Sequence, residues 1–209
     1  LSSSKSDAKI HYTLDGSIPG YTSKLYTYPV KITESTRLLA ISFWKNGEKS
    51  HPVEFDLKKV DPLPSRQTST QKGLSCDFYE GAWEKIPDFS SLKPVRSGIS
   101  PTINLDFAHG QSQDFGLVFK GFITIPSTDV YLFSVSSDDG SRLIIDDIEI
   151  VDDDGIHGMG YKQQSLALEA GLHTVKFLYF QHVGGLGLHV FWESNQFSKE
   201  EIGSNFFNH

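Results

Sequence analysis

The stretch YLFSVSSDDGSRLIIDDIEIVDDDGIHGMG, residues 131–160, decides how this chain folds. At its start Tyr131, Phe133 and Val135 alternate with Leu132, Ser134 and Ser136. Side chains of a strand point alternately to its two faces, so this period predicts a half-buried strand. Two shorter apolar runs, RLII and IEIV, follow and predict two more strands.

Acidic turns follow each of these predicted strands. They are DDG at residues 138–140, DD at 146–147 and DDDG at 152–155. Asp and Gly are common in tight turns because they tolerate left-handed backbone conformations. In an up-down meander the first and third turns fall at the same end of the sheet. We therefore expect Asp138, Asp139, Asp154 and His157 to lie on one rim.

The rest of the chain also favours an all-β fold built from two β-sandwich modules. It has 209 residues, with 18 Gly and 15 Phe and few helical patterns, which suits one large or two small domains. A segment rich in Pro, Ser and Thr cannot build a core and predicts a linker. The predicted organisation is a first module over residues 1–58, a linker over 59–72 and a second module over 73–209.

Weaker patterns predict the remaining elements. Strands are expected at residues 9–14, 25–32, 36–44 and 51–57. Residues 86–101 contain three prolines and predict a loop that covers a sheet edge. The C-terminal tail predicts a short helix around Lys199.

Composition excludes several classes of function. The net charge of -7 argues against non-specific binding to nucleic acid or to an anionic membrane. The apolar runs are too short to cross a bilayer, so no membrane insertion is expected. Cys76 is the only cysteine, so an internal disulfide is impossible, and its strand position predicts a small buried side chain.

The second half resembles the PA-fourteen domain, named for anthrax protective antigen and shared with yeast flocculins. The carrying segments are GLSCDFYEGAWEKIPDFSSLKPVRSG, VFKGFITIP, SDDGSRL, VDDDGIHG, LALEAGLHTVKFLYFQ and GGLGLHVFW, within residues 73–193. The resemblance implies a β-sandwich that often binds carbohydrate. In the sugar-binding flocculins, the pair that matches Asp138 and Asp139 is joined by a cis peptide and holds calcium. The calcium then binds sugar hydroxyls.

The first half resembles the small C-terminal domain of chitobiases and β-hexosaminidases. IHYTLDGSIP, YPVKIT and TRLLAISFWKNGEKS carry this resemblance, over residues 9–57. It implies an immunoglobulin-like β-sandwich, without catalytic residues of its own, appended to an upstream catalytic domain. The start of this module is expected to be truncated.

The Asp138 and Asp139 pair is the sharpest candidate site. Neighbouring side chains on a regular strand point to opposite faces, so two carboxylates on one cation need a distorted backbone. Calcium prefers such oxygen ligands at a loop tip. The alternative is a simple capped turn. The flocculins add an Asn from a second loop, for which Gln181 is the nearest equivalent here.

Four other residues are candidate sugar contacts or, alternatively, structural ones. We expect His157 and Gln181 to offer hydrogen bonds to a sugar, and Trp83 and Tyr161 to offer stacking surfaces. Most aromatic residues of a sandwich belong to its core, which is the competing interpretation. The third acidic turn, residues 152–154, is read as a solvated turn or as a second cation site.

These features together predict a non-catalytic carbohydrate-binding region. Glycoside hydrolysis needs two carboxyl groups separated across a sugar, and adjacent Asp residues do not provide them. The expected parent is a secreted, periplasmic or cell-surface bacterial glycoside hydrolase of β-hexosaminidase or fucosidase type. The expected partner is a glycan containing N-acetylhexosamine, galactose or fucose. One rival is a module that packs on the catalytic domain without binding sugar, and another is a free-standing enzyme.

Overall fold

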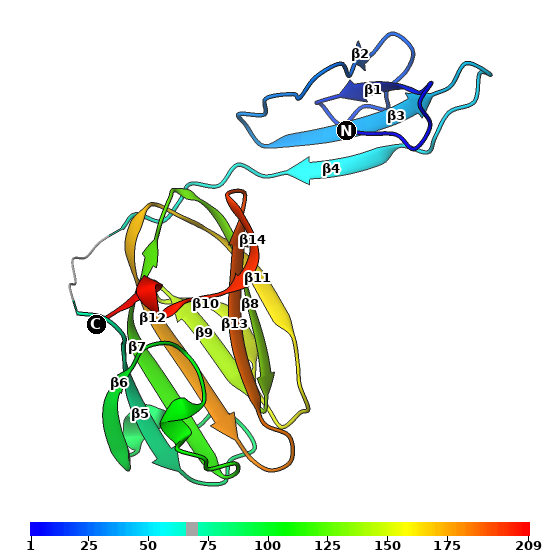
Figure 1. Ribbon diagram of the computed structural model, residues 1–209. Coiled ribbons are helices and arrows are strands. Elements are labelled where there is room, and N and C mark those ends of the chain that lie inside the picture. The colour runs from blue at the N-terminus through cyan, green and yellow to red at the C-terminus, as the bar shows by residue number, and fades with distance from the viewer. Residues whose placement is uncertain (66–70) are drawn as a thin grey trace. The chain divides into compact units, whose positions relative to one another are not determined.

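A computed structural model describes residues 1–65 and 71–209. The chain divides into two compact units, Leu1–Asp61 and Pro62–His209 (Figure 1). Strands dominate both units, which confirms the all-β prediction. Residues 66–70 of the predicted linker lie outside the described residues. Before them, the Leu63 N–H donates to the Ala167 carbonyl at 2.9 Å, so this part of the predicted linker is fixed to the second unit.

The first unit contains one antiparallel sheet in the order β2-β1-β3-β4. Its strands are β1 (Lys9–Thr13), β2 (Lys24–Leu25), β3 (Thr36–Phe43) and β4 (Val53–Leu57). Tyr12, Leu38 and Ala40 form the buried cluster of this sheet. Two packed sheets were expected, whereas the described strands of this unit make one. Strand β2 is shorter than predicted, ending before Pro29, which has no N–H for a sheet ladder.

The second unit is a sandwich of two sheets. One sheet has the order β10-β9-β12-β7-β5-β6, with β15 also pairing β7, and the other has the order β11-β8-β13-β14. The strands of the first sheet are β5 (Leu74–Glu80), β6 (Arg96–Ser100), β7 (Phe115–Ile125), β9 (Ser141–Ile145), β10 (Ile148–Asp153), β12 (Gly171–Gln181) and β15 (Phe207–Asn208). Those of the second are β8 (Asp129–Asp138), β11 (Lys162–Leu168), β13 (Gly187–Ser194) and β14 (Phe197–Glu201).

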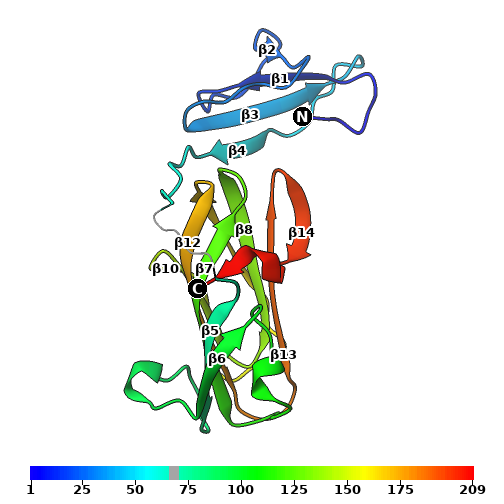
Figure 2. The same ribbon diagram turned by 60° about the vertical axis from the view of Figure 1, so that its left-hand side comes forward.

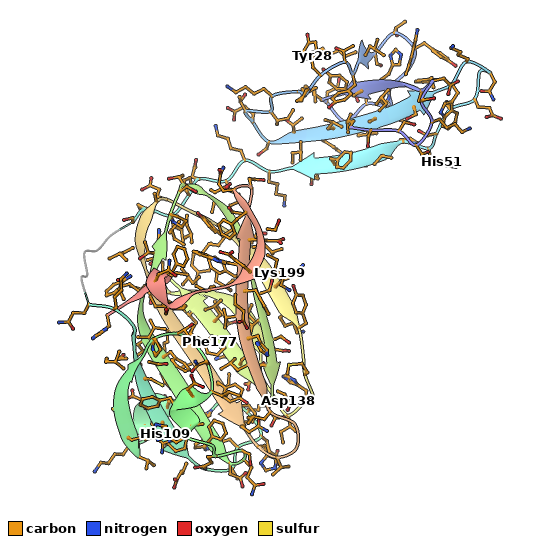
Figure 3. All side chains as sticks on the ribbon, viewed as in Figure 1. Tyr28, His51, His109, Asp138, Phe177 and Lys199 are labelled. Carbon is orange, nitrogen blue, oxygen red and sulfur yellow. The ribbon has the colours of Figure 1, made fainter. Side chains whose placement is uncertain are left out.

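The strands of the second unit run past one another in Figure 2, and side chains from both sheets meet in one apolar core. Tyr131, Phe133 and Val135 point into it from β8, as the alternation predicted. In the opposite sheet Phe177, near the centre of the unit in Figure 3, contacts Phe119 edge to face. Burying one such side chain stabilises a fold by about 1.5–3 kcal/mol. The strands that precede the acidic turns are therefore anchored in a well-packed core.

The predicted meander of three strands is wrong. Strand β8 pairs with β11 and β13, whereas β9 pairs with β10 and β12, so the chain crosses between sheets after β8. The connecting residues 137–141 are buried instead of forming an exposed hairpin turn. At Gly140 an added Cβ would overlap the Phe180 ring, so only glycine fits this crossing. The buried crossing places Asp138 and Asp139 at one end of the sandwich.

Two further predictions need correction. The proline-rich segment contains β6, which pairs with β5 at the edge of the larger sheet, where Arg96 stacks on the Phe78 ring at 3.6 Å. The tail around Lys199 forms strand β14 and not a helix, because pairing with β13 overrides the local helix propensity of Lys and Glu. The short helices present are the three-residue 3-10 turns η1 (Phe89–Ser91), η2 (Asp106–Ala108) and η3 (Ser204–Phe206). Within the described ranges, a helix of the length and apolarity needed to span a bilayer is absent.

Candidate functional site

The peptide bond between Asp138 and Asp139 is cis, as the resemblance to the flocculins implied. Both residues are buried, Asp138 to 8% exposure and Asp139 to 1%. Figure 3 shows Asp138 at the lower end of the second unit. Two adjacent carboxylates in such a place repel each other unless partners compensate. Their partners therefore decide what the site can do.

Asp139 is satisfied by two backbone donors from two different loops. Its Oδ1 accepts the His157 N–H at 3.0 Å, and its Oδ2 accepts the His182 N–H at 2.8 Å. We call residues 154–160 the first loop and residues 182–186 the second loop. Hydrogen bonds to an ionised carboxylate are roughly twice as strong as neutral ones. Asp139 therefore ties the two loops together.

Asp138 has no such partners. Its main-chain carbonyl accepts the Tyr179 hydroxyl, but its carboxylate receives no hydrogen bond from the residues that the structure describes. Burial, together with repulsion from the Asp139 carboxylate, raises the pKa of Asp138. The Asp138 carboxylate therefore has no protein donor among the described residues, and a cation or ligand hydroxyls can supply its partners.

Gln181 supports the second loop from beneath. Its side chain is fully buried, its Oε1 lies 2.6 Å from the Tyr179 hydroxyl oxygen, and its Nε2 donates to the Gly185 carbonyl at 2.7 Å. Both ends of the amide are therefore used inside the protein. We expected Gln181 to contact a sugar directly. Its buried position instead makes it a residue that positions the second loop.

His157 belongs to the structure of the first loop. Its Nδ1 lies 2.7 Å from the Gly158 carbonyl and its Nε2 lies 3.1 Å from the Asp153 carbonyl. Burial disfavours the charged ring, but these carbonyls and the nearby Asp153 and Asp139 charges outweigh it and raise the pKa of His157. Both ring nitrogens thus have acceptors within the loop, and the residue meets Asp139 through its backbone.

The third acidic turn has its own partners. The Arg142 guanidinium lies 3.2 Å from Asp152 and 3.8 Å from Asp154. Asp154 also accepts the Ile86 N–H at 2.6 Å. Asp154, expected on one rim with Asp138, is thus held by partners of its own. Arg142 is shared by the carboxylates of Asp152, Asp154 and Glu149.

The two candidate aromatic residues differ in exposure. Trp83 packs edge to face on Phe89, at 5.7 Å between ring centroids, and joins a small cluster on the larger sheet. Tyr161 is 49% exposed, and its hydroxyl accepts the Lys199 ammonium at 3.0 Å. The core interpretation fits Trp83, whereas Tyr161 presents a ring to solvent. Cys76 is buried as predicted, and this burial raises the pKa of its thiol to about 12.

Tyr179 and Gly185 complete the site; the sequence did not point to Tyr179, whereas Gly185 lies in the glycine-rich segment 181–187 that was expected to border the ligand. Tyr179 supports Asp138 from the core, and Gly185 passes so close that an added Cβ would overlap Oδ2 of Asp138. The glycine-rich composition of the second loop was the available signal for Gly185. No signal marked Tyr179 among the alternating aromatic residues of β12.

The side chains at this site supply only some of the ligands that a hard cation needs. In the part of the chain that the structure describes, no group of three or more His, Cys, Asp or Glu side chains is placed to hold a metal ion. Calcium takes six to eight oxygen ligands, so two carboxylates would need help from backbone carbonyls, water or a ligand. The free carboxylate of Asp138 is the observation that fits such an ion.

Each unit of the chain matches the model of a known domain family. The second unit matches the PA14 domain family over residues 104–205. The first unit matches the family described as Fn3 associated over residues 1–56. The chitobiase-type terminal domain expected for the first unit is not supported, since a different family matches there.

Individual proteins resemble the chain over different spans. A β-hexosaminidase of Porphyromonas gingivalis is 25% identical over 201 residues, covering 88% of this chain and 24% of that protein. The chain spans about a quarter or less of the length of the curated relatives it matches. An anti-sigma factor domain-containing protein has a TM-score of 0.58 at 17% identity, covering 96% of this chain and 76% of its own. The PA14 sugar-binding domain of an RTX adhesin has a TM-score of 0.56 at 18% identity, covering 67% and 99%. These structural likenesses concern the fold.

Proposed function

We propose that this chain is a non-catalytic glycan-binding region whose ligand site is the Asp138 carboxylate and the two loops beside it. One observation carries the proposal: the Asp138 carboxylate has no donor among the described residues, while its neighbour Asp139 is fully used to fix both loops. A carboxylate without protein partners is free to accept a cation or the hydroxyls of a ligand. The sugar-binding PA14 domain of the RTX adhesin has the same fold, which supports this reading.

We propose calcium as the group that completes the site. Asp138 would be its main carboxylate ligand, and Asp139 and the carbonyls of the second loop would supply further oxygens. A bound calcium ion supplies positive charge and open coordination positions that sugar hydroxyls can fill. It would also remove the penalty of burying Asp138, because a cation favours the ionised carboxylate. Without the ion, Asp138 can accept hydrogen bonds from sugar hydroxyls directly.

The wider setting of the chain follows from its relatives. We propose a parent glycoside hydrolase of β-hexosaminidase or fucosidase type, secreted, periplasmic or on the cell surface. The β-hexosaminidase relative supports this parent, and the sugar-binding adhesin domain supports an extracellular setting. The glycan would contain N-acetylhexosamine, galactose or fucose. Holding an enzyme near such a glycan raises its effective concentration without new chemistry.

A module that packs on a catalytic domain and binds no sugar is the rival. It would leave the Asp138 carboxylate without a function. The two proposals differ in a simple measurement on the isolated chain, because only the first requires it to bind a sugar.

The test is calorimetric titration with N-acetylglucosamine, galactose and fucose, in calcium and in chelator. We expect one of these sugars to bind in calcium and to bind at least tenfold more weakly in Asp138→Ala. Calcium at 100 times its dissociation constant should stabilise the fold by about 2.7 kcal/mol. Absence of binding to all three sugars and to a glycan array would favour the packing module. Sugar binding that chelator leaves unchanged would exclude calcium but keep the glycan site.

A further inference from the structure

Asp138 stands at the end of a row of residues on the outer face of the smaller sheet. Because Tyr131, Phe133 and Val135 of β8 point into the core, Ser136 and Asp138 share the opposite face. The register continues this face onto β13, where Ser134 pairs with Phe191, Ser136 with His189 and Asp138 with Gly187. The outer face of the sheet is therefore continuous with the proposed ligand site.

Exposed apolar side chains line this row. Met159, 53% exposed, lies against Gly187, where an added Cβ would overlap its methyl group. Tyr161 comes next on the same side, and the Lys199 ammonium lies 4.4 Å from its ring centroid and 4.5 Å from that of Phe191. Figure 3 shows Lys199 further along the unit from Asp138. We call Met159, Tyr161, Phe191 and Lys199 the outer strip.

The outer strip has the chemistry of a sugar-stacking surface. Aromatic faces pack against the apolar C–H faces of pyranose rings, and nearby polar groups bond their hydroxyls. Lys199 forms no ion pair within the described ranges and donates to the Tyr161 hydroxyl, so its remaining N–H groups are available. His189 is paired with Glu201 at 2.6 Å, and Glu193 lies on the same face. These carboxylates favour a neutral sugar over an acidic one.

The length of this row of residues on the outer face indicates how many sugar units a ligand needs to cover it. A strand rises about 3.4 Å per residue, so Asp138 and Ser134 are separated by about 14 Å along β8. One hexose ring cannot span this distance. A single sugar at Asp138 would leave the strip uncovered.

We propose that the outer strip is a second subsite, which takes the following units of a neutral oligosaccharide whose first unit binds at Asp138. This inference rests on the proposed glycan site and specifies its ligand class. The chain would then distinguish oligosaccharides from monosaccharides. Tyr161 would contact the ligand directly, and Lys199 would hold the Tyr161 ring and donate to a sugar hydroxyl.

The test compares N-acetylglucosamine and galactose with their linear β-linked trimers, by calorimetry on the whole chain. The variants are Tyr161→Ala, Tyr161→Phe and Lys199→Gln. Tyr28→Ala is the control, because Tyr28 is a 75% exposed tyrosine of the first unit. We expect a trimer to bind more tightly than its monomer. Tyr161→Ala should weaken the trimer about tenfold and leave the monomer unchanged, while Tyr161→Phe, which keeps the ring, should retain most of the gain.

Three outcomes would overturn this inference. Equal affinities for monomer and trimer, with no effect of Tyr161→Ala, would remove the second subsite but keep the site at Asp138. An equal loss in Tyr161→Ala and Tyr28→Ala would show that the effect is not local. Failure of every sugar to bind would overturn the proposed function itself. Melting temperatures of all variants check that each one folds.

Discussion

Gly185 lies directly against the carboxylate of Asp138, so that a Cβ at this glycine would overlap Oδ2 of the aspartate. The backbone of Gly185 is in turn fixed by the amide of Gln181 at 2.7 Å. The space between the second loop and the Asp138 carboxylate is open only because Gly185 has no side chain. A ligand of Asp138 must enter through that space.

Substitution of Gly185 by Ala should therefore block the site without unfolding the protein. The added methyl group displaces the Asp138 carboxylate, and the φ angle at Gly185 lies outside the left-handed region, so alanine brings no backbone strain. We expect at least a tenfold loss of sugar affinity and a change in stability below about 1 kcal/mol. Calorimetry and thermal unfolding measure the two quantities. Gly20→Ala, in open space in the first unit and away from the site, is the matched control and should bind normally.

Removing the charge of Asp138 should stabilise the ligand-free protein. Its pKa is raised in the folded state, so the folded state holds the proton more tightly and stability falls as pH rises through that pKa. Asp138→Asn should gain about 1 kcal/mol at pH 7 in chelator, and the gain should vanish below about pH 4. Urea unfolding between pH 4 and 8 measures this difference. A variant that is less stable than the parent at pH 7 would contradict it.

Removing the charge of Asp139 should destabilise the protein, in contrast to Asp138. Asp139→Asn replaces one acceptor by an amide N–H that faces the backbone N–H of His157 or His182. Leaving a buried donor unpaired costs about 1–3 kcal/mol, and both loops lose their common anchor. We expect this loss in urea unfolding together with loss of sugar binding. Asp147→Asn, in an exposed turn, is the control and should change neither.

The third acidic turn should be dispensable for binding. Asp152 is partly exposed and paired with Arg142, and such pairs contribute about 0–1 kcal/mol. Asp152→Ala should keep sugar affinity within about twofold of the parent, as calorimetry can show. Binding lost in Asp152→Ala but retained in Asp138→Ala would mean that the wrong acidic turn carries the site.

Trp83 should prove structural. Its ring packs against Phe89 and over Gly81, where an added Cβ would overlap the indole. Trp83→Ala should cost about 2–4 kcal/mol in thermal or urea unfolding, with sugar affinity retained in the folded fraction. Loss of affinity at unchanged stability would restore the role of Trp83 as a stacking platform.

Local patterns were enough to predict most of the strands. The alternation at residues 131–135 gave the inward face of β8, and the strand expected at residues 36–44 is β3, Thr36–Phe43. Such patterns are readable because each strand buries one face and therefore alternates. Lys199 shows the limit: its neighbours favour a helix, and only pairing with β13, distant in sequence, makes the segment a strand.

The sequence by itself determined that this protein is built of strands, that an adjacent acidic pair follows one of them, and that the pair lies in a PA14-like stretch. Only the tertiary structure decided which role Asp138 has and which role Asp139 has. The crossing from β8 to β9 depends on partners in other strands, and Gly140 fits there because of Phe180, 40 residues away along the chain. Asp139 meets the backbone of His182, 43 residues away, while Asp138 meets no donor among the described residues. Two chemically identical side chains receive different roles because their hydrogen-bond partners come from loops that only folding brings together.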